Sequence, residues 1–266
     1  MRVTAPAQKH PSGIVDIHSH ILWGLDDGVR SMDESLRMLS DAAAAGTAHI
    51  VATPHANDEF HFDPAIISER IAELQIASAG SLRIHRGCDF HLSAQNIEDA
   101  LHNPAKYTIN GGPYLLVEFP DMFISPASEH ILGRLRESGM IPVITHPERN
   151  LVLQRDLARV KRWAAAGYLV QVTGLSLLGR FGKAARESAW ALIESGAAHI
   201  VASDAHDPED RHARLDEVRT AVAERAGNEA AEMLFENNPG AVITGAPVMV
   251  SPPLPRPRRK WYRFGR

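Results

Sequence analysis

Short apolar runs recur along the chain, and longer segments with helical spacing of their apolar residues lie between them. The first run, 14–18, is rich in β-branched residues and predicts a strand. Ser31 and Glu34 then have the spacing of a capping box, which predicts a helix through Ala45 that Gly46 ends. This alternation predicts βα units and a parallel sheet.

The same unit repeats to the end of the chain. Further strands are expected to begin near residues 49, 82, 114, 140, 168 and 198, and further helices to cover about 64–79, 96–102, 128–138, 155–166, 183–195, 215–225 and 229–235. GTAHIVATPH and GAAHIVASDAH, at 46–55 and 196–206, show this unit placed twice. About seven such strands can close into an α/β barrel, and an open doubly wound sheet is the alternative.

Composition narrows the class of protein. A length of 266 residues with 44% hydrophobic and 23% charged residues fits one barrel-sized globular domain. A net charge of −4 argues against a general nucleic-acid binder. A single cysteine excludes an intramolecular disulfide. Neither an apolar signal segment nor a run of about 18 apolar residues is seen, so a cytoplasmic protein is expected.

Residues of the kind that bind metals lie at the carboxyl ends of the expected strands. They are His18, His20, His55, Asp89, Glu118, His146, Asp204 and His206. His18 and His20 are two positions apart on a strand, so both side chains can reach one ion. Each residue alone could be a surface or capping residue, but active sites of parallel barrels are built at this end. Histidine mixed with carboxylate suits Mn, Zn or Fe, and the number of ligands predicts two or three ions.

Phosphoester hydrolysis is the chemistry that such a cluster favours, because bound ions activate water and stabilise the attacking and leaving oxygens. Arg149 and Arg211 follow two of the ligands and are suited to bind phosphate. His49 and His199 lie within expected strands, where a structural role is expected. His61 and His91 lie near the site in sequence and are candidates for contact with the substrate.

The motifs resemble those of a known family. DIHSHILWGLDDG, ATPH, VEF, THPERN, QVTGLSLLGRFG and SDAH are similar to those of the bacterial PHP-superfamily protein-tyrosine phosphatases of capsule and exopolysaccharide systems, over about 14–245. The resemblance implies a distorted (β/α)7 TIM-like barrel with three metal ions, preferably Mn2+, with Fe, Zn, Co or Mg as alternatives. It also implies hydrolysis of phosphotyrosine on the bacterial tyrosine kinase that regulates polysaccharide synthesis and export, with metal-activated hydroxide as the nucleophile.

The family's functional residues can be carried over by motif. Three groups would each hold one ion: His18 and His20 with Asp204; Glu118 and His146 with Asp89, which would bridge to the first ion; and Asp27, His55 and His206. Arg149 and Arg211 would bind the phosphate. The family usually has glutamate where this chain has Asp89.

Two other functions are compatible with the ligand set. One is a PHP phosphoesterase that acts on a small molecule such as histidinol phosphate. The other is a non-catalytic metal-binding partner of an export complex. The DDG and GLSLLGRFG segments favour the tyrosine phosphatase, and the two arginines disfavour a non-catalytic role.

The chain divides into an N-terminal arm (1–13), a phosphatase domain (14–246) and a tail (247–266). The tail has six basic residues, three aromatic residues and five prolines, so it is either solvated or in contact with an anionic membrane surface. Cysteine-based phosphatases have an arginine six residues after the nucleophile, whereas Ala94 follows Cys88 at that distance. Cys88 is therefore expected to be a buried structural residue.

Overall fold

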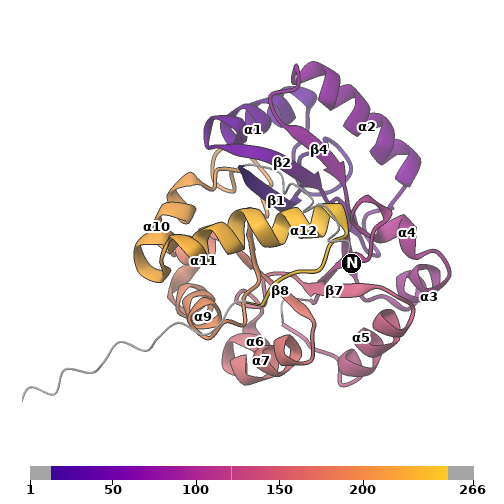
Figure 1. The fold of residues 1–266 in the computed structure, drawn as a ribbon. Coiled ribbons are helices and arrows are strands. Elements are labelled where there is room, and N and C mark those ends of the chain that lie inside the picture. The colour runs from indigo at the N-terminus through magenta and orange to yellow at the C-terminus, as the bar shows by residue number, and fades with distance from the viewer. Residues whose placement is uncertain (1–12, 121, 251–266) are drawn as a thin grey trace, which may run out of the picture.

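The computed structural model describes residues 13–120 and 122–250, and in them parallel strands surround one axis with helices outside (Figure 1). The strands are β1 (Ile14–Ser19), β2 (Thr47–Ala52), β3 (His55–Ala56), β4 (Arg83–Arg86), β5 (Asp89–His91), β6 (Tyr114–Glu118), β7 (Ile141–Ile144), β8 (Leu169–Thr173) and β9 (Ile200–Ala202). β3 continues β2 and β5 continues β4, so the nine strands occupy seven positions.

Hydrogen bonds close these positions into a barrel. The parallel ladders run in the orders β1-β2-β4 and β3-β5-β6-β7-β8-β9. Where β2 and β4 are interrupted, the backbone N–H of Asp89 donates to the carbonyl of Pro54 at 3.1 Å and keeps the two positions paired. Between the first and last strands, the N–H of Asp204 donates to the carbonyl of His18, and the N–H of His20 donates to that of Ala205, both at 2.8 Å. The predicted distorted barrel is therefore confirmed, and the open sheet was the wrong alternative.

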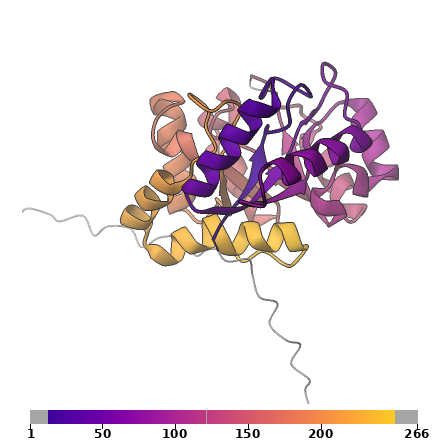
Figure 2. The same cartoon turned by 90° about the horizontal axis from the view of Figure 1, so that it is seen from above.

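Helices cover the outside of the barrel (Figures 1 and 2). The longer ones are α1 (Met32–Ala44), α2 (Pro64–Ala77), α3 (Ala94–His102), α5 (Ser128–Glu137), α7 (Leu157–Ala165), α9 (Gly182–Glu194) and α10 (Asp216–Ala226). The shorter ones are α4 (Pro104–Tyr107), η1 (Ile109–Gly111), α6 (Leu151–Arg155), α8 (Gly174–Leu177), α11 (Asn228–Glu232), η2 (Met233–Asn237) and α12 (Asn238–Thr244). No helix of the described ranges is long and apolar enough to cross a membrane.

The start of α1 shows how local sequence sets these boundaries. Ser31 caps the helix, because its hydroxyl accepts the N–H of Glu34 at 3.3 Å. The Glu34 carboxylate accepts the N–H of Arg30 at 2.8 Å, so it bonds one residue before the position that a capping box predicts. Gly46 follows the helix with a φ of 88°, as predicted from the sequence.

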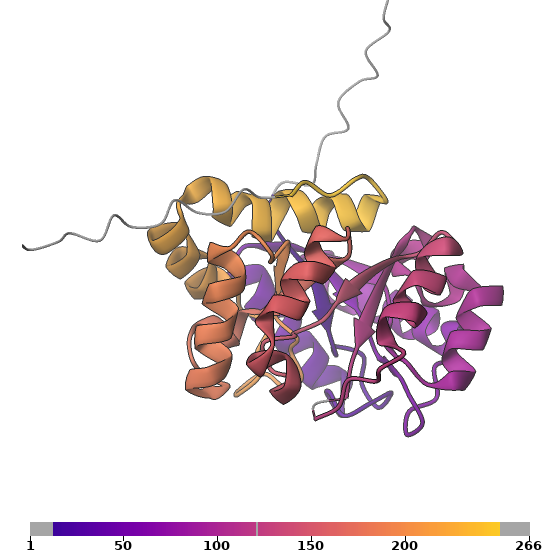
Figure 3. The same cartoon turned by 90° about the horizontal axis from the view of Figure 1, so that it is seen from below.

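The amino end of the barrel is filled by apolar side chains. Val15, Leu116 and Val143 pack there with Val242 and Ile243 of α12. Figure 3 shows α12 lying across this end, while the loops that follow the strands lie at the other. The polar residues at the carboxyl ends of the strands therefore face an end that α12 does not cover.

Two expectations about elements were wrong. The strand expected from residue 82 is interrupted between β4 and β5. The helix expected over 155–166 is α7, and a short helix that was not expected, α6, precedes it and meets it at Asp156. Asp156 caps α7 by accepting the N–H of Arg159 at 3.1 Å. The last helical segment does not end near 235 but continues through η2 and α12 to Thr244. Pro239 lies in the first turn of α12, where a proline is tolerated.

Candidate active site

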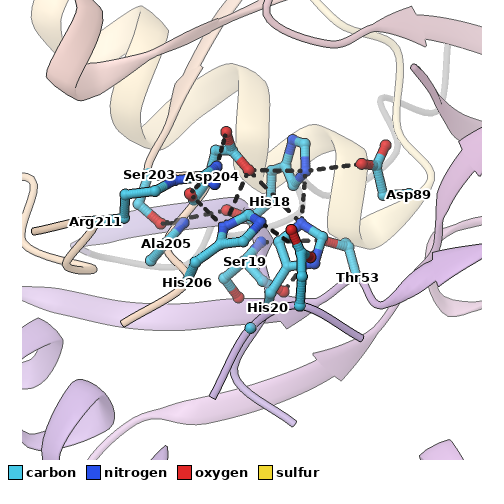
Figure 4. A network of polar contacts seen from close by, with 12 residues as sticks. His18, Ser19, His20, Thr53, Asp89, Ser203, Asp204, Ala205, His206 and Arg211 are labelled. Atoms are coloured by element: carbon cyan, nitrogen blue, oxygen red, sulfur yellow. Dashed lines mark hydrogen bonds and ion pairs between the residues drawn. The ribbon is translucent and has the colours of Figure 1, made fainter. Parts of the chain in front are cut away.

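The nine residues that the resemblance implies as metal ligands come together at the carboxyl end of the barrel. In the described residues, their nitrogen and oxygen atoms form groups with ligand atoms within 4.8 Å of one another: His20, Asp27, His55 and His206; His18, His20 and Asp89; His18, His146 and Asp204; and His55, Asp89 and Glu118 together with His91. Figure 4 shows part of this network, with Asp89 on one side of His18 and Asp204 with Arg211 on the other.

The imidazoles of His18 and His20 point to the same place, as their spacing predicts. Their Nε2 atoms lie 3.3 Å apart. Nδ1 of His18 lies 3.0 Å from Oε1 of Gln171, and Nδ1 of His20 lies 2.7 Å from Oδ2 of Asp26. Metal-binding imidazoles are commonly oriented in this way by a partner on the second nitrogen.

The loop after β1 folds back over His20. Oδ1 of Asp26 accepts the N–H of Gly28 at 3.0 Å, and Oδ2 accepts the N–H of His55 at 3.2 Å. A Cβ at Gly28 would lie 2.4 Å from the carbonyl oxygen of His20, so only glycine fits there. Asp26 thus belongs to the candidate site, and sequence reasoning misses it although it is the first residue of the DDG motif.

Asp27 is the partly exposed member of the group. Its Oδ1 lies 3.5 Å from Nε2 of His206 and 3.3 Å from Nε2 of His55. These two histidines lower the pKa of Asp27 far below its usual range. Its half-exposed side chain places this group at the solvent side of the site.

Asp89 lies at the centre of the cluster and is completely buried. Its Oδ2 is 3.1 Å from Nδ1 of His55 and 3.5 Å from Nε2 of His18, yet within the described residues neither carboxylate oxygen has a partner with hydrogen-bond geometry. Burial opposes its charge, but His18 and His55 outweigh burial and hold the pKa well below the usual value. Although shorter than the family's usual glutamate, Asp89 reaches histidines of two groups.

His91 is a second residue that sequence reasoning does not place among the ligands. Its Nε2 contacts Oε2 of Glu118, and its ring lies edge-on to that of His55. Nε2 of His146 lies 3.3 Å from the other oxygen of Glu118. Burial and the nearby Asp89 charge raise the pKa of Glu118 to about 7. The spacing of Asp89 and His91 on β5 matches that of His18 and His20, and this signal could have found it.

Two of these residues have a left-handed backbone. The φ angles are 29° for His146 and 52° for Asp204, and each residue lies two positions after the end of a strand, β7 or β9. This conformation is costly for residues other than glycine and is found at functional sites. The carbonyl of His146 also accepts the N–H of Arg149 at 2.9 Å, so the same turn carries the arginine into the site.

Arg149 and Arg211 meet at Asp204. Oδ2 of Asp204 accepts a hydrogen bond from Arg149 and one of 2.8 Å from Arg211. Oδ1 of the same carboxylate lies 3.5 Å from Nε2 of His18. Nε of Arg211 is buried without a hydrogen-bond partner in the part of the chain that the structure describes. The two arginines are therefore next to the histidine–carboxylate cluster.

The chemistry of the donors fits divalent cations. The cluster mixes imidazoles with carboxylates, and the buried Asp89 oxygens lack hydrogen bonds among the described residues. Asp89 and Asp204, whose charges outweigh burial, raise the pKa of His18 to about 9, so positive charge is favoured there. Cys88 is completely buried. Burial, and to a smaller extent the negative charge of Asp89, raises the pKa of its thiol well above the usual value, which makes it a poor nucleophile.

The remaining histidines that the sequence singled out do not join the cluster. His49 pairs with His85 at 2.9 Å on β2 and β4. His199 is buried, and its Nδ1 accepts the N–H of Val170 at 3.1 Å. His61 is exposed on the loop between β3 and α2. Structural roles fit His49 and His199.

Comparison with known proteins agrees with this geometry. Residues 14–244 match the family described as "Capsular polysaccharide synthesis, CpsB/CapC". This chain belongs to that family. The CpsB/CapC match spans the barrel from β1 to α12 and therefore includes every candidate ligand.

Two relatives of this chain are named as tyrosine phosphatases. Tyrosine-protein phosphatase YwqE of Bacillus subtilis is 31% identical over 255 residues, which cover 94% of this chain and 100% of the relative. Tyrosine-protein phosphatase CpsB of Streptococcus pneumoniae is 30% identical over 243 residues, which cover 86% of this chain and 98% of CpsB.

Solved structures with a similar fold are known. A structure from a crystallographic study of YwqE and CpsB, described there as unique metal-dependent tyrosine phosphatases, matches with a TM-score of 0.84 at 30% identity, over 92% of this chain and 100% of that one. A beta-aspartyl dipeptidase from Fervidobacterium islandicum matches with a TM-score of 0.54 at 13% identity over 86% of this chain. The second likeness concerns the barrel alone.

Proposed function

We propose that this protein is a metal-dependent phosphotyrosine-protein phosphatase of a capsule or exopolysaccharide system. The observation that carries the proposal is the position of Asp204, whose one oxygen faces the histidines of the cluster while the other accepts from Arg149 and Arg211. Cation ligands and phosphate-binding groups are thus adjacent, as hydrolysis of a phosphoester requires.

The proposed metal ligands are the nine residues carried over from the family, with His91 as an additional candidate. Two or three ions are proposed, and Mn2+ is the preferred one. Divalent ions held by these residues would lower the pKa of bound water and stabilise charge on phosphoryl oxygens.

The chain's own residues would do the rest. Arg149 and Arg211 would donate hydrogen bonds to the phosphoryl oxygens, and Gln171 and Asp26 would keep His18 and His20 oriented. Burial of most of the cluster would exclude bulk water, which strengthens each of these interactions.

The proposed substrate is the phosphotyrosine of a bacterial tyrosine kinase that regulates polysaccharide export, and the proposed location is the cytoplasm. The tail after residue 250 lies outside the described residues. Its contact with an anionic membrane surface remains a proposal based on six basic residues.

A substrate panel tests the function. The purified protein with Mn2+ should hydrolyse a phosphotyrosine peptide faster than a phosphoserine peptide or histidinol phosphate, and a chelator should abolish the activity. Preference for histidinol phosphate would instead identify a small-molecule phosphoesterase. A protein that binds metal but hydrolyses none of the three would be a non-catalytic partner.

A further inference from the structure

The segment 171–182, which runs from the second half of β8 to the first residue of α9, contacts the site at several points, although the proposed chemistry uses none of its residues directly. Gln171 orients His18, as described above. Ser176 donates a hydrogen bond of 2.7 Å to the buried carboxylate of Glu148, which precedes Arg149. Phe181 provides a third contact, and it is made with both arginines.

The ring of Phe181 lies beside both guanidinium groups. Its centroid is 4.4 Å from Cζ of Arg149 and 5.9 Å from Cζ of Arg211. The two arginines come from different loops, one after β7 and one after β9. Both distances are within the range in which an aromatic ring attracts a cation.

Two different groups thus hold the arginine pair. Asp204 binds both guanidinium groups through one oxygen, and Phe181 contacts both through one ring. Arginine side chains are long and flexible, and two like charges repel each other. An aromatic ring can attract both without using the hydrogen-bond donors that a phosphate needs.

The backbone fixes the position of this ring. Phe181 immediately precedes α9, between two glycines with φ angles of 86° at Gly179 and 87° at Gly182. The N–H of Gly182 donates to the carbonyl of Gly179 at 3.0 Å and closes the turn. Both glycines have a conformation that other residues rarely adopt, so this turn depends on the sequence GRFG.

We propose that Phe181 is a positioning residue of the phosphate site, which holds Arg149 and Arg211 ready to receive the phosphoryl group. This inference rests on the proposed function insofar as it concerns turnover. The effect of Phe181 on phosphate binding can be measured without catalysis.

The test replaces the ring and measures phosphate binding. Phe181→Leu keeps an apolar side chain without the π face, and Phe181→Tyr keeps the ring. The affinity of the metal-loaded protein for inorganic phosphate is measured by calorimetry, together with kcat/KM for an aryl phosphate and the metal content. Phe181→Leu should lower both the affinity and kcat/KM by about three- to thirty-fold at unchanged metal content, and Phe181→Tyr should stay within about threefold of the native protein.

A double-mutant cycle shows whether Phe181 acts through the arginines. In an Arg149→Ala background, which removes the closer contact, the loss caused by Phe181→Leu should shrink to below about twofold. Tyr168→Leu is the matched control, because Tyr168 precedes β8 at the amino end of that strand, and its ring centroid lies 5.9 Å from Cζ of Arg136. It should lower thermal stability and leave phosphate affinity unchanged.

Three results would overturn the proposal: normal phosphate affinity in Phe181→Leu, an equal loss in Phe181→Tyr, or a loss that persists in full without Arg149. The proposed function fails separately. If phosphate affinity depends on Phe181 and Arg149 as expected but the protein does not hydrolyse phosphotyrosine, the positioning role of Phe181 stands and the proposed phosphatase activity is refuted.

Discussion

Asp89 and Cys88 are neighbours with opposite chemistry. The Asp89 carboxylate lies between two histidines and has no hydrogen bond within the described residues. The Cys88 thiol, in contrast, is buried among apolar side chains. Their adjacency allows the metal-dependent and the cysteine-dependent routes to be separated by substitutions at consecutive positions.

We expect Asp89→Asn to lower kcat/KM by at least about 10²-fold and to lower the bound metal measured by elemental analysis, because the amide lacks the charge that a bridging ligand needs. Cys88→Ser is the matched control and should keep most of the activity. An inactive Cys88→Ser with normal fold and metal content would contradict the proposed chemistry.

Gly28 tests the loop over His20. Because a Cβ there would lie 2.4 Å from the carbonyl oxygen of His20, Gly28→Ala must displace Asp26 or His20. We expect a loss of activity of about tenfold or more and weaker metal binding. Gly133→Ala on α5 is the control, since a Cβ at that position would have no neighbour within 4 Å, and it should stabilise the helix by about 0.5–1 kcal/mol in urea unfolding.

At the residue scale, most of the candidate site follows from sequence because strand ends converge in a parallel barrel. His91 was expected near the site but not among the ligands, even though it has the same spacing from Asp89 as His20 has from His18. The left-handed φ of His146 and Asp204 could not be predicted from the sequence, because histidine and aspartate adopt this conformation only occasionally. The sequence presents Phe181 only as part of a motif, since its two partners are distant along the chain.

At the scale of elements, repeated short strands and helices were enough to predict the barrel. The breaks between β2 and β3 and between β4 and β5 were not predicted. The apolar pattern continues across each break, although the strand pairing passes from one sheet to the other there. The extension to α12 was missed because its role is tertiary: it packs Val242 and Ile243 into the amino end of the barrel. Local pattern therefore predicted the elements better than their ends.

His199 joins three elements and should make stability depend on pH. His199 immediately precedes β9. Its Nδ1 accepts the N–H of Val170 in β8, and its carbonyl accepts a hydrogen bond of 2.8 Å from the side chain of Asn238 in α12. Burial lowers its pKa to about 4, whereas an unfolded histidine has a pKa near 6.5. As the pH falls, the unfolded state therefore binds the proton first. The contribution of His199 to the free energy of unfolding is fully present above pH 6.5, and about 3 kcal/mol of it is lost as the pH drops toward 4.

Urea unfolding at several pH values measures this contribution. His199→Asn should be less stable at pH 7.5 but should lose less stability than the native protein between pH 7.5 and 4.5. His130→Asn, at an exposed position of α5, should follow the native profile. Parallel profiles for the native protein and His199→Asn would contradict the assignment.

At the scale of the whole molecule, the cluster connects most of the strand positions through charged groups. Ions that bind only the folded state should therefore stabilise the barrel as a whole. We expect a chelator to lower the melting temperature by roughly 5–15 °C and to abolish activity, and Mn2+ to restore both. Asp89→Asn should show a smaller chelator-induced shift, and an unchanged melting temperature in the native protein would argue against tightly held ions.

The closure of the barrel between β1 and β9 has a consequence for how the protein is made. The N–H of Ser203 donates to the side chain of Asp16, a partner 187 positions earlier in the chain, and the neighbouring bonds join His18 to Asp204. His18 and His20 are therefore synthesised early but acquire Asp204 and His206 only when nearly the whole chain has left the ribosome. Contacts so distant in sequence form slowly, because a long loop must be closed first. We expect nascent or truncated chains to lack the complete ligand set. Binding of metal ions would therefore indicate that the barrel has closed.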